Sequence, residues 1–313
     1  MKILITGVAG FLGSNLATRL IKDGHTVIGV DDFSTGSPRN LLKLKNSKKF
    51  EFFCQDIRNK LNFDVHAILN FACPASPVHY QSDPVRTIET NFLGMVNVLH
   101  LAQKLGCRVV QASTSEVYGD PLVTPQTEEY WGNVNPIGIR SCYDEGKRAA
   151  ETLCFDYLRQ YDTDIRVVRI FNTFGPGMAI GDGRVVSNFI VQALTNKPLT
   201  IYGNGDQTRS FCYVSDLVEG VVKTLELEDK VNLPINLGNP TEHTMRELAE
   251  LVIELTVSNS KMEFKPLPLD DPQQRKPDIS RAKSILNWEP QIGIAEGIMK
   301  TASYFRNLID AQA

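Results

Sequence analysis

The N-terminal stretch Lys2-Ile3-Leu4-Ile5-Thr6-Gly7-Val8-Ala9-Gly10-Phe11-Leu12-Gly13 decides the fold of this chain. The apolar run over 2–6 predicts a strand, the glycines predict a tight turn, and the pattern over 11–23 predicts a helix. A second strand is predicted over 26–31, so the chain opens as a strand–helix–strand unit. The G-x-x-G-x-x-G spacing lets a pyrophosphate approach the N-terminus of the helix, as the commoner G-x-G-x-x-G does. We therefore expect a dinucleotide site, with a purely structural turn as the alternative.

The alternation of strands and helices continues through the first half of the chain. Further strands are predicted over 50–56, 67–71, 108–112 and 165–170, and long helices over 91–105 and 141–161. This order predicts an α/β fold, a Rossmann-type doubly wound parallel sheet with helices on both faces.

The pattern changes after residue 170. The segment 171–184 is rich in Gly and Asn and predicts a loop, and shorter elements follow. They are a helix over 186–196, strands over 199–202 and 209–213, a helix opened by the capping box Thr244-Met245-Arg246-Glu247, and helices over 280–286 and 294–306. We expect an NAD-binding Rossmann domain over 1–171 and a smaller C-terminal α/β lobe, mainly for substrate, over 172–313. The chain is expected to cross between them more than once.

Composition and charge exclude several classes of protein. The chain has 313 residues, 42% hydrophobic and 22% charged, with a formal net charge of -3. The mild acidity and the lack of a basic block argue against nucleic-acid binding, and no apolar run is long enough to span a membrane. A strand is predicted to begin at Lys2, so we expect no signal peptide before the fold, with a longer precursor as the alternative. The six cysteines lack metal-binding spacing, so we expect free thiols, no metal and a cytoplasmic location.

The ends of two predicted strands carry acidic residues suited to a cofactor. A carboxylate at Asp31, which ends the second strand, can accept hydrogen bonds from the adenosine ribose and repel a 2′-phosphate. This position favours NAD over NADP, with a solvated loop aspartate as the alternative. Asp56 and Ile57, at the end of the third strand, are weaker candidates to flank the adenine.

Tyr143 and Lys147 are candidate catalytic residues because a spacing of four puts them on one face of a helix. An ammonium group and the positive nicotinamide lower the pKa of a neighbouring phenol, so that phenolate can take a proton from a substrate hydroxyl. A surface pair is the alternative. The hydroxyl-rich turn Ser113-Thr114-Ser115, which follows a predicted strand, favours the catalytic interpretation because it can hold the same substrate hydroxyl.

These motifs resemble those of the extended short-chain dehydrogenase/reductase family that acts on nucleotide sugars. The resemblance rests on Gly7-x-x-Gly10-x-x-Gly13, 113–116, Tyr143-x-x-x-Lys147 and Asn172. Longer stretches resemble the UDP-glucuronate decarboxylases, also called UDP-xylose synthases, within that family. These stretches are 72–77, 113–121, 142–148, 182–189 and 275–279, and the likeness runs from Met1 to about Arg306.

The resemblance implies a reaction. UDP-glucuronate is oxidised at C4 by NAD, the resulting β-keto acid loses carbon dioxide, and the enolate is protonated at C5. The retained NADH then reduces C4, and UDP-xylose leaves.

The resemblance also implies roles for individual residues. Tyr143 is the base and later the acid, Lys147 tunes it and orients the nicotinamide ribose, and Thr114 binds the C4 hydroxyl. Ser115 and Glu116 are expected near C5 and C6; related 4,6-dehydratases carry an Asp-Glu pair in this turn, and Ser115 replaces the first acid. Arg275 matches the arginine that binds the carboxylate and assists proton delivery. The alternatives are a strand-end surface carboxylate for Glu116 and a solvated loop charge for Arg275.

The remaining expected contacts divide between cofactor and substrate. The residues expected to bind NAD are Gly7, Gly10, Phe11, Leu12, Gly13, Asp31, Asp32, Ser34, Thr35, Gly36, Asp56, Ile57, Phe71, Ala72, Cys73, Tyr143, Lys147 and Thr173. Those expected to bind UDP-glucuronate are Tyr80 at the sugar, Tyr202 at the uracil, Asn172, Arg184 and Arg209 at the diphosphate, and Arg275. The arginines can instead form surface salt bridges, and Tyr202 can be a core aromatic.

Two positions depart from the family pattern, since Gly177 stands where an arginine is usual and Cys73 where Ser or Ala is usual.

The family implies a homodimer through the helices over 91–105 and 141–161. The apolar candidates for this contact are Val98, Leu101, Ala149, Leu153 and Leu158, which can equally be core residues.

The competing functions are a nucleotide-sugar 4-epimerase, a 4,6-dehydratase, and a non-catalytic NAD-binding protein. The last normally requires loss of Tyr143 or Lys147.

Overall fold

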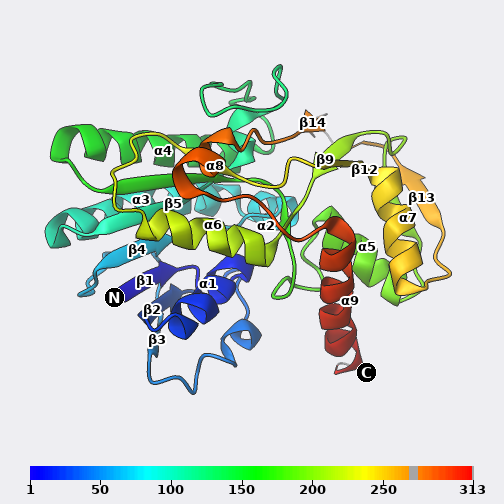
Figure 1. Ribbon diagram of the computed structural model, residues 1–313, viewed down its shortest axis with the longest axis horizontal. Helices are drawn as coiled ribbons and strands as arrows, with labels where there is room; N and C mark the ends of the chain where they lie inside the picture. The colour runs from blue at the N-terminus through cyan, green and yellow to red at the C-terminus, as the bar shows by residue number, and fades with distance from the viewer. Residues whose placement is uncertain (268–273, 312–313) are drawn as a thin grey trace.

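A computed structural model describes residues 1–267 and 274–311. This part of the chain forms a seven-stranded sheet in which every neighbouring pair of strands is parallel (Figure 1). Its order is β11 (Ile235–Leu237), β6 (Ile165–Ile170), β5 (Arg108–Thr114), β4 (Ala67–Asn70), β1 (Lys2–Thr6), β2 (Thr26–Asp31) and β3 (Phe50–Cys54). The predicted doubly wound α/β fold is confirmed.

Helices cover both faces of the sheet. Because side chains alternate between the two faces along a strand, neighbouring residues of one strand contact different helices. Ile3 and Ile5 belong to a hydrophobic cluster with α1 (Phe11–Lys22) and α6 (Val214–Glu226). Leu4, between them, points the opposite way into a cluster with α3 (Pro84–Leu105) and α4 (Ser141–Tyr161). Because both faces are buried, the central strands are almost continuously apolar.

The second part of the chain forms short sheets packed beside α5 (Val185–Leu194), α7 (Met245–Thr256) and α9 (Ile294–Asp310), drawn from green to red in Figure 1. Its strand pairs are β8 (Leu199–Tyr202) with β13 (Met262–Lys265), and β7 (Thr173–Phe174) with β10 (Cys212–Tyr213). A third sheet sets β9 (Thr208–Ser210) between β12 (Glu242–Thr244) and β14 (Gln274–Arg275). The short helices are η1 (Pro38–Leu41), α2 (Pro77–Ser82), η2 (Ser115–Tyr118) and α8 (Ser280–Leu286).

Several element predictions needed correction. The strand predicted over 209–213 is two strands, β9 and β10, which lie in different sheets. The segment predicted as a loop contains β7, and α3 begins at Pro84 rather than residue 91 because Asp83 caps its N-terminus by accepting from the Arg86 amide. The capping box of Thr244 and Glu247 is confirmed at the start of α7.

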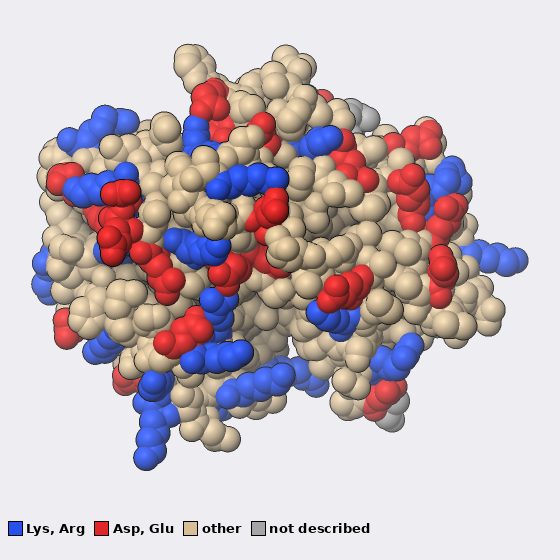
Figure 2. All heavy atoms as spheres, in the orientation of Figure 1, with Lys and Arg blue, Asp and Glu red and all other residues tan. Residues whose placement is uncertain are grey.

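The described surface carries charges of both signs. On the face drawn in Figure 2, Lys and Arg alternate with Asp and Glu rather than gathering in one field. Throughout the described ranges, no helix combines the length and apolar character needed to cross a lipid bilayer. All six cysteines lie within these ranges as free thiols.

The apolar residues exposed on α3 are not the ones predicted to form a subunit contact. Val98 and Leu101, named as candidates for a subunit contact, are buried in the core against the sheet, so the core alternative is correct for them. The exposed apolar side chains of α3 are instead Val85, Ile88, Phe92 and Leu93.

Candidate active site

A cavity of about 860 Å³ opens at the carboxyl ends of β1, β4 and β5 and extends to β8, β9 and β14. Ligands of doubly wound sheets bind in this position. The cavity brings together many residues that sequence analysis singled out. They are Gly7, Gly10, Phe11, Leu12, Gly13, Thr35, Phe71, Cys73, Thr114, Ser115, Glu116, Tyr143, Lys147, Asn172, Thr173, Arg184, Tyr202, Arg209 and Arg275.

The glycine loop has the shape that a pyrophosphate needs. Gly10 is the N-cap of α1 and lines the cavity, so the capping position itself places no side chain between the cavity and the helix N-terminus. A Cβ atom on Gly13 would lie 2.1 Å from the Gly7 carbonyl oxygen, which is why only glycine allows the helix to pack this closely on the loop. The loop therefore fits a dinucleotide.

Asp31 is buried at the end of β2, where its two carboxylate oxygens accept from the Ala9 amide at 2.9 Å and the Phe33 amide at 2.8 Å. Burial raises the pKa of the Asp31 carboxyl, and these two bonds oppose that shift. The carboxylate thus fixes the glycine loop to the turn after β2.

Several residues predicted to bind the cofactor do not line the cavity in the described part of the chain. They are Asp31, Asp32, Ser34, Gly36, Asp56, Ile57 and Ala72.

Two of those acidic residues are held by arginines. The Asp32 carboxylate accepts from Arg86 at 2.6 Å and from the Ser34 amide at 2.9 Å. Asp56 accepts from Arg58 at 2.8 Å, and this guanidinium helps to hold the pKa of the Asp56 carboxyl below its usual value even though burial opposes the shift.

Tyr143 and Lys147 lie on the buried face of α4, against the end of β5. The Lys147 ammonium donates to the Ala112 carbonyl at 2.9 Å and lies 5.8 Å from the centroid of the Tyr143 ring. The Tyr143 hydroxyl shares a hydrogen bond with the Thr114 side chain. One face of the helix and one strand end therefore present a phenol, an ammonium and a hydroxyl to the same part of the cavity.

The pKa of the Tyr143 phenol is raised, whereas the sequence analysis expected it to be lowered. Burial raises it, and the hydrogen bond from Thr114 opposes that effect. Burial also lowers the pKa of Lys147. Formation of a phenolate therefore needs positive charge near the Tyr143 ring, which Lys147 at 5.8 Å and a bound nicotinamide would supply together.

Glu116 is held between two arginines. Its carboxylate accepts from Arg275 at 2.7 and 2.8 Å, one nitrogen to each oxygen, and from Arg140 at 2.8 Å. Burial raises the pKa of Glu116, but the two guanidinium groups outweigh burial and hold it below its usual range. Sequence analysis missed Arg140, whose available signal was its position three residues before Tyr143 and just before the stretch 142–148.

Tyr80 differs from its predicted position at the sugar. Its ring is 1% exposed and stacks on the Tyr143 ring, with centroids 5.1 Å apart and planes 4° apart. It is not among the described residues that line the cavity. Tyr80 thus lies behind the catalytic candidate and supports its ring.

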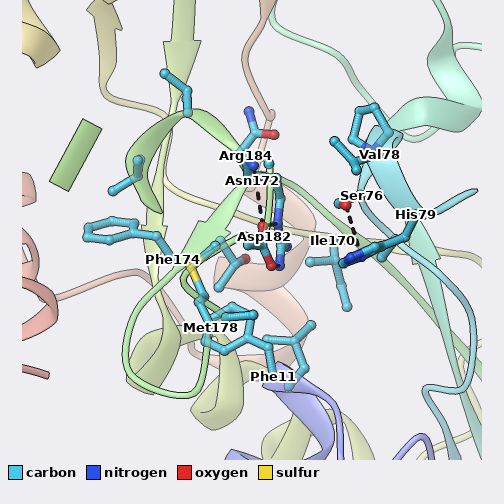
Figure 3. A pocket seen from close by; sticks show the side chains of 18 of the residues that line it. Phe11, Ser76, Val78, His79, Ile170, Asn172, Phe174, Met178, Asp182 and Arg184 are labelled. Atoms are coloured by element: carbon cyan, nitrogen blue, oxygen red, sulfur yellow. Dashed lines mark hydrogen bonds and ion pairs between the residues drawn. The ribbon is translucent and has the colours of Figure 1, made fainter. Parts of the chain in front are cut away.

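The far end of the cavity holds residues expected at the nucleotide. Arg184 pairs with Asp182 at 2.5 Å, the interaction drawn as a dashed line in Figure 3. Its guanidinium lies 5.5 Å from the centroid of the Phe11 ring. The Asn172 amide donates to the Ser210 carbonyl at 3.4 Å. Arg209 is buried on β9, whereas the Tyr202 ring is 45% exposed at the end of β8, available to a flat base.

The two departures from the family pattern both line the cavity. Gly177 has a φ of +103°, in the region that favours glycine, and its carbonyl accepts from the Asn40 amide at 3.1 Å. Burial raises the pKa of the Cys73 thiol, so it is a thiol rather than a thiolate at neutral pH. His79, which also lines the cavity, bonds with Ser76 at 3.2 Å and was not anticipated from the sequence (Figure 3).

A buried network holds the end of β5 from behind. Ser113 donates to Glu151, which is paired with Arg169 at 2.8 Å, and Arg169 donates in turn to the Tyr118 hydroxyl. Tyr118 donates to Asn236 of β11 at 2.8 Å. The network fixes the strand end that carries Thr114 and the turn that carries Glu116.

Comparisons with known proteins agree with this geometry. The profile of the NAD dependent epimerase/dehydratase family matches residues 3–238. UDP-glucuronic acid decarboxylase 1 of Arabidopsis thaliana is 55% identical over 309 residues, which are 99% of this chain and 71% of the relative. The decarboxylase 1 of Danio rerio is 51% identical over 100% of this chain and 74% of its own length.

Solved structures share the whole fold. UDP-glucose 4-epimerase of Thermotoga maritima superposes with a TM-score of 0.90 at 28% identity, covering 99% of this chain and all of that one. UDP-glucuronic acid 4-epimerase of Bacillus cereus, solved with UDP-glucuronic acid and NAD, gives 0.88 at 27% identity over 98% of this chain and all of that one. With decarboxylases at about twice the identity of these epimerases along nearly its full length, this chain belongs to the UDP-glucuronic acid decarboxylases of the NAD dependent epimerase/dehydratase family.

Proposed function

We propose that this chain is an NAD-dependent carboxy-lyase that converts UDP-glucuronate to UDP-xylose and carbon dioxide. The observation that carries the proposal is the buried Arg275–Glu116 pair beside Tyr143 and Thr114. A guanidinium fork recognises a carboxylate, and here it stands next to a residue pair suited to oxidise an alcohol. The substrate of the related decarboxylases carries both groups.

Oxidation begins at the C4 hydroxyl of the sugar. Thr114 holds this hydroxyl, and Tyr143 removes its proton while the hydride leaves C4. NAD held by the glycine loop would supply the hydride acceptor for this step and the hydride donor for the last one. Lys147, fixed by the Ala112 carbonyl, stays close enough to the Tyr143 ring to stabilise the phenolate.

Carbon dioxide leaves from the resulting 4-keto acid. The ketone two carbons from the carboxylate accepts the electron pair of the breaking C5–C6 bond, and an enolate forms. Arg275 binds the carboxylate before the bond breaks, exchanging its pairing with Glu116 for pairing with the substrate. Tyr143 later returns its proton to O4 when C4 is reduced.

The other predicted binding residues are assigned to NAD or to the nucleotide sugar by their place along the chain. We propose that residues 1–171 mainly bind NAD and that 172–313 mainly bind the nucleotide sugar, with Arg184, Arg209 and Asn172 at the diphosphate and Tyr202 at the uracil. The cavity-lining position of these four residues supports this assignment. Asp31 and the other candidates beside the wall act by holding the loops around the cofactor.

We also propose a homodimer formed through α3 and α4, in the cytoplasm. Ile88, Phe92 and Leu93 expose apolar surface on α3, and Ala149 and Leu153 lie part-exposed on α4. Exposed apolar side chains on α3, which packs against α4, support an isologous contact between two copies. The six free thiols support a reducing compartment.

The test is to incubate the purified protein with UDP-glucuronate and NAD and to identify the products by NMR. UDP-xylose, carbon dioxide and no net NADH support the proposal. UDP-galacturonate would instead favour a 4-epimerase, the second candidate because the Bacillus cereus epimerase shares the fold. Release of a 4-keto pentose with accumulated NADH would indicate an oxidative decarboxylase. If UDP-glucuronate, UDP-glucose and its thymidine analogue all stay unchanged, the protein is a non-catalytic NAD binder.

A further inference from the structure

The strand that carries Arg275 is too short to hold its own place in the sheet. In β14, Gln274 lies opposite Thr208 of β9. Arg275 lies opposite Arg209, so the pairing sets two guanidinium groups side by side, and like charges at such positions oppose it. Because side chains alternate between the two faces of a strand, a shift by one residue would turn Arg275 away from the cavity. Contacts outside the strand pair must therefore hold β14.

Glu242 of β12 provides one set of these contacts. Its carboxylate accepts from the Gln274 side-chain amide at 3.1 Å and from the Lys276 ammonium at 3.1 Å. It also accepts from the Thr208 hydroxyl at 2.8 Å. Gln274 and Lys276 flank Arg275 in the chain, so in an extended segment their side chains leave on the side opposite to it. One carboxylate that binds both flanking side chains therefore directs Arg275 toward the cavity.

Gln126, in the loop between η2 and α4, provides the second set and is 0% exposed. Its backbone amide donates to the Lys276 carbonyl at 2.8 Å, and its side-chain oxygen accepts from the Lys276 amide at 2.8 Å. The Gln126 carbonyl accepts from the Asp278 amide at 2.9 Å, and its side-chain nitrogen donates to the Val123 carbonyl at 2.7 Å. Three hydrogen bonds thus fix the backbone directly after Arg275.

The contacts of Arg275 itself divide between backbone and side chain. Its carbonyl accepts from the Ser210 hydroxyl at 3.1 Å, whereas its guanidinium pairs with Glu116. Neither Gln126 nor Glu242 lines the cavity in the described part of the chain. They can therefore affect a substrate only through the segment that they hold. A fixed backbone lets the guanidinium exchange Glu116 for another carboxylate without the cost of ordering the strand.

We propose that Gln126 and Glu242 are positioning residues, which hold β14 so that the Arg275 guanidinium can bind the carboxylate of the substrate. This inference rests on the proposed function. The two residues serve recognition of the carboxylate alone, and the nucleotide and the C4 hydroxyl are bound by other parts of the cavity. Their loss should therefore weaken binding of a nucleotide sugar that has a carboxylate and spare one that has none.

The kinetic test uses Gln126→Leu, which keeps the size of the side chain and removes its hydrogen bonds, as the full chain with NAD bound. We expect kcat/KM for UDP-glucuronate to fall roughly 3–10-fold, the value of about one hydrogen bond. Glu242→Ala should cause a similar loss. Glu242→Gln keeps an oxygen for Thr208 and Gln274, so it should stay within about twofold of wild type.

The binding test separates positioning from general damage to the fold. Affinities for UDP-glucuronate and UDP-glucose are measured by calorimetry in Tyr143→Phe, so that the sugar is not consumed. We expect Gln126→Leu to weaken binding of UDP-glucuronate roughly 3–10-fold and binding of UDP-glucose less than twofold. When Arg275→Ala is also present, Gln126→Leu should change the affinity for UDP-glucuronate less than twofold, because the arginine that it positions is gone.

Asp216→Ala is the matched control. The Asp216 carboxylate holds another C-terminal loop by accepting from the Gln291 amide at 2.9 Å and the Ile292 amide at 2.8 Å. Asp216 does not line the cavity among the described residues, so its loss should leave the ratio of the two affinities unchanged. If Gln126→Leu fails to fold, Glu242→Ala decides the matter, since that carboxylate is partly exposed.

The outcomes separate the two proposals. Wild type that forms no UDP-xylose overturns the proposed function together with the positioning role. Wild type that forms UDP-xylose, while Gln126→Leu and Glu242→Ala keep its kcat/KM and its ratio of affinities, overturns the positioning role alone. Equal weakening of both nucleotide sugars, or an undiminished effect of Gln126→Leu beside Arg275→Ala, also overturns it, because the residue would then act on the fold as a whole.

Discussion

Arg275 and Glu116 form a bidentate ion pair in which the two guanidinium nitrogens lie 2.7 and 2.8 Å from the two carboxylate oxygens, across 159 residues of sequence. Both side chains are nearly buried at the wall of the cavity. A buried fork of this kind contributes direction as much as affinity, because its planar geometry matches only a planar anion.

Replacing Arg275 by lysine should show whether the positive charge or the planar guanidinium geometry is needed to bind the substrate carboxylate. Lysine keeps the positive charge but loses the fork, so we expect kcat/KM for UDP-glucuronate to fall by roughly 10–100-fold, the value of one or two charged hydrogen bonds. Binding of UDP-glucose, which has no carboxylate, should change less than twofold. Steady-state kinetics and calorimetry measure the two effects. Arg159→Lys, on the exposed end of α4, is the control, and equal losses for both nucleotide sugars would contradict the prediction.

Removal of the Tyr143 hydroxyl should stop chemistry without loosening the cofactor. Tyr143→Phe keeps the ring that stacks on Tyr80, so the site should retain its shape. We expect kcat to fall about 10²- to 10⁴-fold, the usual value of a general acid–base group, with NAD affinity unchanged. Tyr157→Phe, later on α4, should retain full activity. Substantial turnover by Tyr143→Phe would remove this residue from its proposed role.

The Glu151–Arg169 pair behind β5 should be important for stability. Arg169→Ala leaves a buried carboxylate without its cation, so we expect the free energy of unfolding to fall by about 3–5 kcal/mol. Arg159→Ala removes a partner from the exposed pair with Asp156 and should cost less than about 0.5 kcal/mol. Urea denaturation followed by circular dichroism measures both values, and similar losses in the two variants would contradict the prediction.

The protonated Asp144 predicts a characteristic pH dependence of stability. Its folded-state pKa of about 8 lies far above the value near 4 of an unfolded aspartate, so the native state holds a proton that the unfolded chain releases. This contribution is fully present below about pH 4 and declines by at most about 1.4 kcal/mol per pH unit as the pH rises to about 8. Asp144→Asn should therefore gain stability relative to wild type between pH 5 and 8. A difference that stays constant with pH, measured by urea denaturation beside Glu145→Gln, would contradict this assignment.

A charge on the exposed face of α3 should separate the proposed dimer. Phe92 is 43% exposed, and glutamate in its place would bury a carboxylate at the contact. We expect Phe92→Glu to elute with the mass of one chain in light-scattering chromatography, whereas wild type elutes as two. Met299→Glu, on the exposed side of α9, is the control. A wild type that is already monomeric would exclude the contact.

Local patterns predicted the glycine turn and the helix face shared by Tyr143 and Lys147, whereas seven other residues predicted to bind the cofactor do not line the described cavity. Gly10, Tyr143 and Lys147 lie within short motifs whose chemistry depends on neighbours along the chain, so their place on one turn and one helix follows from spacing. Arg275 is different, because its partner is 159 residues away and only the family resemblance pointed to it. Neither Arg140 nor Asp144 was singled out, since their importance arises from the charges that the fold collects around Glu116.

Sequence patterns also failed to predict several short elements, because strand pairing in the fold defines them rather than the local sequence. The run 209–213 has the alternation of one strand, but its two ends pair with β12 and β14 on one side and with β7 on the other. The three residues of β11 are too few to carry a period, and only the edge of the sheet makes them a strand. Tyr80 was expected at the sugar because its motif borders the site, yet the direction of its ring is decided by packing on Tyr143.

Arg275 reaches the active site from outside the part of the chain that the family profile matches. The profile shared by epimerases and dehydratases ends at residue 238, and Tyr143, Lys147 and Thr114 all lie inside it. Arg275 enters from a two-residue strand beyond that boundary, joined to the rest by pairing with β9. Its partner Glu116 lies inside the matched segment, so the ion pair joins the region shared with the epimerases and dehydratases to a strand outside it.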